Sequence, residues 1–330
     1  MNLDKEKVGN NQPDELNKEC SCSQREALKS CSNSEGRKET SACLKEEKTI
    51  SASSEGLNEK CTHSKGEALK GCSDSEELKE TSACPDKEKV GSSLFVAESF
   101  HVDFTGHLTM SVLGNELLNC ADSHAEQRGF GMTKLSDNQY TWVLSRLVIE
   151  MKRMPRQHEK FCIRTWVENV YRLFTDRNFE MVTTEGEVLG YARSIWAMIN
   201  IETRKPEELL SLHGGQISDY VCDKECPIER PGRIKVRTEV PVREYQTQYS
   251  DIDINGHVNS VKYMEHMLNL FPLDLFREKR IGRFEIAYHA ESYFGDTLSF
   301  YREEVEENEY DIEVRKNGGE VVCRSKVKFI

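Results

Sequence analysis

The 330-residue sequence lacks several features that would assign it to a common functional class. It has no apolar run long enough to cross a bilayer, and its first residues lack the apolar core of a signal peptide. Acidic residues outnumber basic ones, 57 to 45, and no long basic stripe offsets the formal net charge of −12. We therefore expect a cytoplasmic protein with no membrane span and no nucleic-acid partner.

Two signatures of catalytic or metal chemistry are also missing. No G-x-S-x-G sequence surrounds any serine, which argues against a serine hydrolase of the nucleophile-elbow type. The twelve cysteines form no C-x-x-C pairs, and Cys222 and Cys226 are one residue too far apart for a zinc knuckle. Without a secretion signal, reduced thiols are favoured over disulfides.

The first 92 residues contain an internal repeat. Segment 16–48 recurs at 57–89, a period of 41 residues (57 minus 16), and "DKEKVG" at 4–9 recurs at 86–91. Each copy has almost no Val, Ile or aromatic residue, so stacking the copies would gain little hydrophobic free energy against chain entropy. We predict that residues 1–92 form a disordered, redox-reactive tail, with metal binding by its cysteines as the lesser alternative.

From residue 95 the sequence follows one order twice: a strand, a long helix, then a run of strands. Residues 109–131 predict a helix that ends at glycines, and residues 233–250 alternate like a strand. We expect α+β domains of one design at 95–204 and 233–330, joined by a linker at 205–232. An antiparallel sheet wrapped on a central helix fits this order in each domain.

The two halves share a motif directly before each helix. Asp103, Gly106 and His107 in "VDFTGHLTMSV" match "IDINGHVNSVK" as D-x-x-G-H, at a constant shift of 150 residues (253 minus 103). A gene duplication would place both copies in the same structural position. The alternative is chance combined with the preference for Asp and Gly before helices.

The second copy carries more polar chemistry than a helix cap needs. Asp253, Asn255 and His257 alternate along the chain, so their side chains could share one face. The following helix N-terminus would stabilise negative charge that develops on a carbonyl oxygen. Together these groups suit attack on an acyl group, although any one of them alone is more simply a cap.

The stretch "SDIDINGHVNSVKY" resembles the active-site segment of the acyl-[acyl-carrier-protein] thioesterases. That family carries D-x-N-x-H-V-N before a helix that contains K-Y. "EIAYHAESYFGDTL" is similar to the family's next strand and turn, and places Glu291 at its second catalytic acid. Ser292 stands where plant members often have cysteine, which favours a carboxylate-based mechanism. The resemblance runs from about residue 95 to the C-terminus.

The resemblance implies a tandem (double) hot-dog fold that hydrolyses fatty acyl thioesters on the phosphopantetheine of acyl carrier protein. This reaction ends chain elongation in fatty acid biosynthesis, with no metal or organic cofactor. Asn255 and the helix N-terminus would hold the thioester oxygen, while Glu291 orients or deprotonates water. His257 would pass the proton to the departing thiol. Asp253 would either fix His257 or attack directly, and the sequence does not choose between these roles.

The first half lacks the second acid and the amide, having Met154 and Thr105 in their places. It is expected to shape the acyl tunnel instead. The candidates are Trp142, Met151, Trp166, Phe179 and Trp196, each of which could equally be ordinary core.

An acidic carrier protein would need a basic landing surface, and two clusters are candidates. They are Lys152, Arg153 and Arg156, and Arg277, Lys279, Arg280 and Arg283. A homodimer is left open. The alternative functions are a hot-dog acyl-CoA thioesterase and a non-catalytic acyl-binding scaffold.

Overall fold

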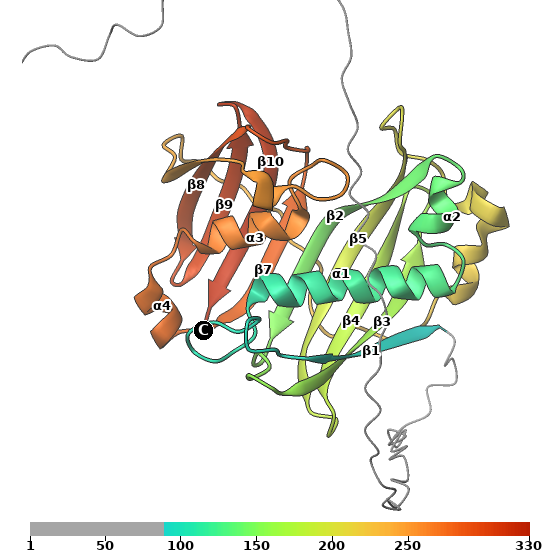
Figure 1. Ribbon diagram of the computed structural model, residues 1–330, viewed down its shortest axis with the longest axis horizontal. Coiled ribbons are helices and arrows are strands. Elements are labelled where there is room, and N and C mark those ends of the chain that lie inside the picture. The colour runs from blue at the N-terminus through green and yellow to red at the C-terminus, as the bar shows by residue number, and fades with distance from the viewer. Residues whose placement is uncertain (1–88) are drawn as a thin grey trace, which may run out of the picture. The chain divides into compact units, whose positions relative to one another are not determined.

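The computed structural model describes residues 89–330 (Figure 1). The predicted tail thus lies outside the described residues except for its last four. Three of those four belong to the first strand, β1 (Val90–Val96), so the folded part begins before the predicted residue 95. The reason is local packing: Val90 pairs with Trp166 and packs against the small core around that indole.

One antiparallel sheet of ten strands runs through residues 89–330. The remaining strands are β2 (Tyr140–Met151), β3 (Lys160–Val170), β4 (Phe174–Thr183), β5 (Val188–Asn200), β6 (Arg243–Gln246), β7 (Ile281–Tyr288), β8 (Thr297–Glu306), β9 (Glu309–Lys316) and β10 (Glu320–Phe329). Their order is β1-β3-β4-β5-β2-β7-β10-β9-β8-β6. The two expected sheets are therefore joined edge to edge, through β2 and β7.

The two central helices lie on the same face of this sheet (Figure 1). The helical elements are α1 (Met110–Gln127), α2 (Met132–Ser136), α3 (Ser260–Leu268) and α4 (Leu273–Glu278), with 3₁₀ segments η1 (Leu209–Tyr220) and η2 (Tyr249–Asp251). The helix predicted at 109–131 is α1, which ends just before Gly129 in the left-handed region at φ 77°. Gly114 allows α1 to approach α3, because a Cβ there would lie 3.0 Å from the Met264 sulfur.

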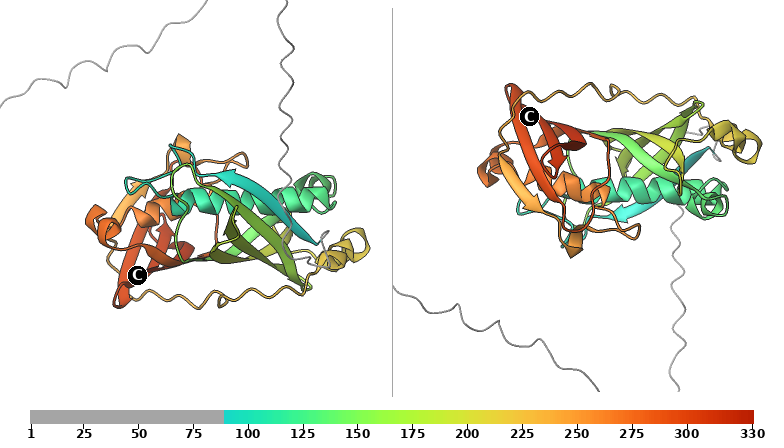
Figure 2. Two further views of the ribbon diagram at one scale, coloured as in Figure 1. Left: turned by 90° about the horizontal axis from the view of Figure 1, so that it is seen from below. Right: turned by 90° about the horizontal axis from the view of Figure 1, so that it is seen from above.

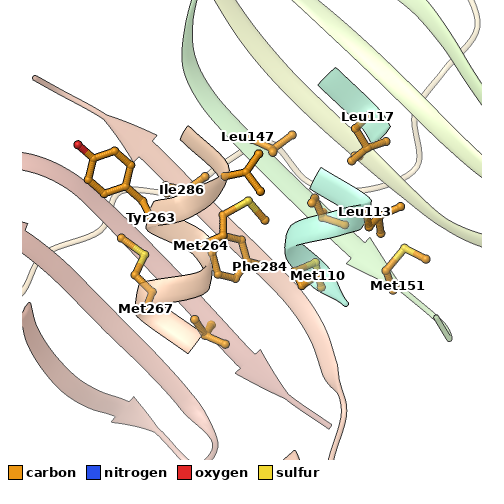
Figure 3. Packing of buried hydrophobic residues seen from close by; sticks show 14 of the residues in the cluster. Met110, Leu113, Leu117, Leu147, Met151, Tyr263, Met264, Met267, Phe284 and Ile286 are labelled. Carbon is orange, nitrogen blue, oxygen red and sulfur yellow. The ribbon is translucent and has the colours of Figure 1, made fainter. Parts of the chain in front are cut away.

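The main core fills the space between these helices and the sheet (Figure 3). Leu113 and Leu117 of α1 and Met267 of α3 have no exposed surface. They meet Phe284 and Ile286 of β7, which are equally buried. Burying a side chain of this size contributes about 1.5–3 kcal/mol, so one continuous core holds the two halves together.

The linker crosses the opposite, outer face of the sheet (Figure 2). The strand predicted at 233–250 is wrong for most of its length, because only β6 is extended and paired. Backbone N–H groups that a strand would use instead donate to carboxylates of the sheet. These bonds are Gly232 to Glu285 at 2.7 Å, Lys235 to Asp311 at 3.3 Å and Arg237 to Glu303 at 2.8 Å.

The two cysteines of the linker lie in a small packed core. Cys222 and Cys226 are buried with Trp166 and Val148 between the linker and the sheet, and burial raises the pKa of the Cys226 thiol. Within residues 89–330, no group of three or more His, Cys, Asp or Glu is arranged to hold a metal ion. No helix of this part of the chain is both long and apolar enough to cross a membrane.

Candidate active site

A tight loop before α3 carries three of the predicted site residues. The Asp253 Oδ1 atom accepts the backbone N–H groups of Asn255 at 2.8 Å and His257 at 3.3 Å. The Asp253 N–H donates in turn to the His257 carbonyl at 2.8 Å. Gly256 closes the loop at φ 80°, where a side chain would be strained. The aspartate therefore builds the loop that presents His257.

The first half contains the same loop. Asp103 Oδ1 accepts the N–H of Thr105 at 2.8 Å and of His107 at 3.5 Å, and Gly106 has φ 76°. The Asp103 N–H likewise donates to the His107 carbonyl, at 2.9 Å. The predicted structural equivalence of the two motifs is confirmed, as a gene duplication would require.

The backbone contacts of the two loops also show which residues of the two halves are structurally equivalent. The Val258 N–H donates to the Ser292 carbonyl at 2.8 Å, and the Leu108 N–H donates to the Pro155 carbonyl at the same distance. Ser292 and Pro155 are thus equivalent, so the preceding residues, Glu291 and Met154, are equivalent too. The carboxylate of the second half is replaced by a thioether in the first.

Glu291 lies beside the imidazole of His257. Its Oε2 atom is 3.5 Å from His257 Nε2, and Tyr293 meets the same ring edge-on at 5.1 Å between centroids. The carbonyl of Glu291 accepts a hydrogen bond from Lys316 Nζ at 2.6 Å. The pair is partly open to solvent, with 23% of the His257 side chain and 34% of the Glu291 side chain exposed. A substrate could therefore reach it.

A residue that the sequence did not suggest holds the other oxygen of this glutamate. Arg204 forms an ion pair with Glu291 Oε1. It comes from the first half, in the turn after β5, where its backbone lies in the left-handed region at φ 57°. Asn200 closes that turn by accepting the N–H groups of Glu202 and Thr203 at 3.0 and 2.8 Å. Nothing in the sequence links two positions 87 residues apart.

The four predicted residues do not form a single hydrogen-bonded chain. Asp253 pairs with backbone groups and, at 3.4 Å, with the Asn255 side-chain amide, rather than with the His257 ring. Asn255 is exposed at the mouth of the loop. The four residues thus form two separate side-chain pairs, Asp253 with Asn255 and His257 with Glu291.

A pocket of about 90 Å³ lies in the first half beneath α1. Trp142 and Trp196, two of the expected tunnel residues, line it, with Phe130 and Ile217 completing much of its apolar wall. The other three candidates belong to packed cores: Met151, Trp166 and Phe179. The pocket is therefore built from the first half together with the 3₁₀ segment η1 of the linker, which supplies Ile217.

Two ionisable residues, Asp122 and Arg177, also line this pocket. Arg177 is 5% exposed, and its Nη1 lies 3.2 Å from Thr165 Oγ1 and 3.1 Å from His124 Nδ1. Burial, together with the nearby Arg177 charge, lowers the pKa of His124 to about 3. A neutral imidazole can accept from Arg177 while its Nε2–H donates to the Lys89 carbonyl at 3.1 Å.

Comparisons with known proteins point to one family. The acyl-ACP thioesterase N-terminal domain matches residues 89–211, and the C-terminal domain of that family matches residues 234–330. A crystal structure of an acyl-ACP thioesterase from Bacteroides thetaiotaomicron is 63% identical, with a TM-score of 0.72 over 74% of this chain and 99% of that one. The 12:0-ACP thioesterase from Umbellularia californica, at 20% identity and a TM-score of 0.67, covers 73% of this chain and 97% of that one.

The curated relatives are more distant. Oleoyl-acyl carrier protein thioesterase 1 from Arabidopsis thaliana is 27% identical, over 62% of this chain and 61% of that protein. The dodecanoyl-[acyl-carrier-protein] hydrolase of Cinnamomum camphora is also 27% identical, over 60% and 55%. The chain spans about half the length of the curated relatives it matches. The predicted tandem hot-dog fold is confirmed. With both domain matches covering most of the sequence, the chain belongs to the acyl-ACP thioesterase family.

Proposed function

We propose that this protein hydrolyses the thioester of fatty acyl-[acyl-carrier-protein], releasing a free fatty acid and ending chain elongation. The observation that carries the proposal is the pairing of His257 with Glu291 at one of two otherwise equivalent loops. The first loop keeps its aspartate and histidine but meets Met154, so it has the fold of the site without its acid.

Water attack is assigned to the His257–Glu291 pair. A carboxylate beside an imidazole can orient the water, accept its proton as the hydroxyl attacks the thioester carbon, and pass that proton to the adjacent His257 ring. When the tetrahedral intermediate collapses, the C–S bond breaks and the imidazolium returns the proton to the departing thiolate. The 3.5 Å separation in the free protein is longer than a hydrogen bond, and we expect it to shorten once substrate excludes water.

Asp253 is assigned a positioning role. Its carboxylate accepts two backbone N–H groups, and such hydrogen bonds lower the nucleophilicity that direct attack on the thioester would need. We propose that Asp253 fixes the loop and thereby the His257 ring. Asn255, exposed beside it, and the N-terminus of α3 would stabilise the oxyanion.

The first half contributes the acyl pocket and Arg204. An apolar pocket lined by Trp142 and Trp196 suits the hydrocarbon chain. Arg204 reaches across to Glu291 and restricts the directions in which its carboxylate can turn. In this view neither half is active alone, because the acid is aligned by a cation from the other half.

Thioester hydrolysis by the purified protein tests this proposal. We expect hydrolysis of acyl-carrier substrates and a fall of about 10²–10⁴-fold in kcat for Glu291→Ala. Asp253→Ala should also lose most of its turnover, because the loop that presents His257 loosens. Near-normal turnover in both variants would contradict the assignment.

Two measurements separate the alternatives. Side-by-side assays with acyl-CoA and acyl-carrier donors distinguish the hot-dog acyl-CoA thioesterase, for which CoA would be the better donor. A non-catalytic scaffold would hydrolyse neither donor. The cytoplasmic location and the homodimer remain predictions from the sequence, and the names of the plant relatives place those proteins in the chloroplast.

A further inference from the structure

Each of the two basic clusters expected to receive a carrier protein contains an arginine that is held by two internal ion pairs. Arg153 is held by Glu159 and Glu187, both at 2.7 Å. Arg283 is held by Glu150 and Glu285, both at 2.8 Å. Cations paired in this way offer little free charge to a partner.

These clusters also lie at the far end of the sheet from Glu291. Arg283 precedes Glu291 by eight residues on and after β7, which is roughly 26 Å of extended chain. On β2, Arg146 pairs with Ala287 near the Glu291 end of β7, and Lys152 lies six residues, or roughly 20 Å, from Arg146 in the opposite direction. A carrier protein bound there would sit a long way from the reacting thioester.

A different group of cations surrounds the end of β7 on the outer face. Arg146 and Arg324 are both cross-strand partners of Ala287, one on each side, so their side chains share a face about 10 Å apart. Ala287 is only four residues, or about 13 Å, from Glu291. Burial, together with Arg324 and Arg146, lowers the pKa of His289, which lies between Ala287 and the catalytic acid.

The linker adds further cations to the same place. Arg233 and Lys235 line a hollow of about 380 Å³ together with Arg315 and Arg324 of the sheet. Two acids pair with these sheet arginines: Glu313 with Arg315 and Arg324, both at 2.6 Å, and Glu239 with Arg315 at 2.7 Å. Arg146, Arg233 and Lys235 are exposed and form no ion pair within residues 89–330.

We propose that Arg146, Arg233 and Lys235, with Arg324 beside them, here called the basic surface, dock the acidic face of the carrier protein that delivers the acyl chain. This proposal rests on the proposed function and names the partner surface for the same site. Three of these four cations form no ion pair within residues 89–330, so in a chain of net charge −12 they form a local field opposite to that of the whole molecule. Such a patch raises the encounter rate with an acidic protein and orients it.

Charge reversal at two exposed members tests the surface. For Arg146→Glu with Lys235→Glu, we expect the KM for acyl-carrier substrate to rise about tenfold at low salt, because two attractions become repulsions. Hydrolysis of the short acyl-pantetheine thioester, which has no carrier protein, should change less than twofold. The rise should shrink as ionic strength screens the charges.

A matched double variant at the far end controls for net charge. Lys152→Glu with Arg156→Glu makes the same change on exposed side chains and should leave the KM for acyl-carrier substrate within twofold of wild type. An equal rise in both double variants, or an equal effect on carrier and pantetheine substrates, would overturn the docking surface. If the first variant folds poorly, Arg146→Gln with Lys235→Gln and the salt dependence of the wild-type KM test the same point.

Failure of the proposed function would be seen separately. A wild-type protein that hydrolyses neither thioester contradicts the activity, and calorimetric binding of holo-carrier protein then still tests the surface. We expect Arg146→Glu with Lys235→Glu to weaken that binding about tenfold. Unchanged binding would refute the surface whatever the activity.

Discussion

Replacing Arg204 by glycine separates its role at the active site from any role in stability. The arginine makes one ion pair, with Glu291, and adopts φ 57°, a conformation that glycine accepts without strain. Arg204→Gly therefore removes the guanidinium while relaxing the backbone. If the residue aligns Glu291 for attack, turnover should fall although the fold does not weaken.

Two effects on the free energy of unfolding oppose each other in Arg204→Gly: loss of the ion pair and relief of the backbone. The side chains of the pair are 40% and 34% exposed, so its loss costs about 0.5 kcal/mol. Relief of the left-handed backbone gains about 1 kcal/mol. The net change is within about 1 kcal/mol, which in a folded part of this size moves Tm by roughly 3 °C or less. Misalignment of the catalytic carboxylate by about 1 Å should lower kcat roughly 10- to 100-fold.

Steady-state hydrolysis of acyl-carrier substrate and thermal unfolding should be measured on the same preparations. We expect the loss in kcat with KM nearly unchanged, partial recovery in Arg204→Lys, and wild-type kinetics in Lys205→Ala, which removes a neighbouring exposed cation. The reasoning is refuted if Arg204→Gly retains full kcat, or if its loss of activity follows a large loss of stability.

Three further predictions concern the fold around the site. Gly91→Ala should destabilise the fold by about 1–3 kcal/mol, because its Cβ would lie 2.5 Å from the His124 ring. Gly319→Ala places its Cβ in open space and should be nearly neutral, and urea unfolding of both variants measures the difference. His124 has a folded pKa of about 3 against 6.5 unfolded, so the unfolded state binds the extra proton and stability falls as pH drops from 6.5 to 3. That loss is about 2.7 kcal/mol at pH 4.5, and His124→Gln should lose correspondingly less between pH 7 and 4.5; equal losses would contradict it. Tyr245→Phe removes the hydroxyl that donates to buried Asp251 at 2.7 Å, and should lower the free energy of unfolding by about 2 kcal/mol. Chemical denaturation measures this, and an unchanged free energy of unfolding would show that the bond is dispensable.

Local sequence patterns predicted the elements that depend on neighbours in the chain. The helix α1 follows from the periodicity of its apolar residues, and its end follows from a glycine, which accepts the positive φ needed there. The two D-x-x-G-H loops form from local contacts, because the Asp side chain, the Gly backbone and the next helix suffice to build them. The equivalence of Met154 with Glu291 also followed, from matching the strand after each of these residues, although the shift there is 137 residues (291 minus 154) rather than 150.

Features that depend on distant partners could not be read in the same way. The segment 233–242 alternates like a strand, but its N–H groups meet carboxylates of the sheet rather than another backbone. Arg204 reads as part of a polar turn, and its ion pair exists only because two half-sheets are joined at β2 and β7. That Arg153 and Arg283 are held in internal ion pairs could likewise be learned only from the structure, which shows the acids that face them.

The most direct test compares two histidines that share one loop geometry. Acyl-carrier hydrolysis should be measured for His257→Ala and for His107→Ala under identical conditions. We predict a fall in kcat of at least about 100-fold for His257→Ala and less than about twofold for His107→Ala, because only His257 lies beside a carboxylate. Similar kcat values in the two variants would contradict the assignment of catalysis to the His257–Glu291 pair.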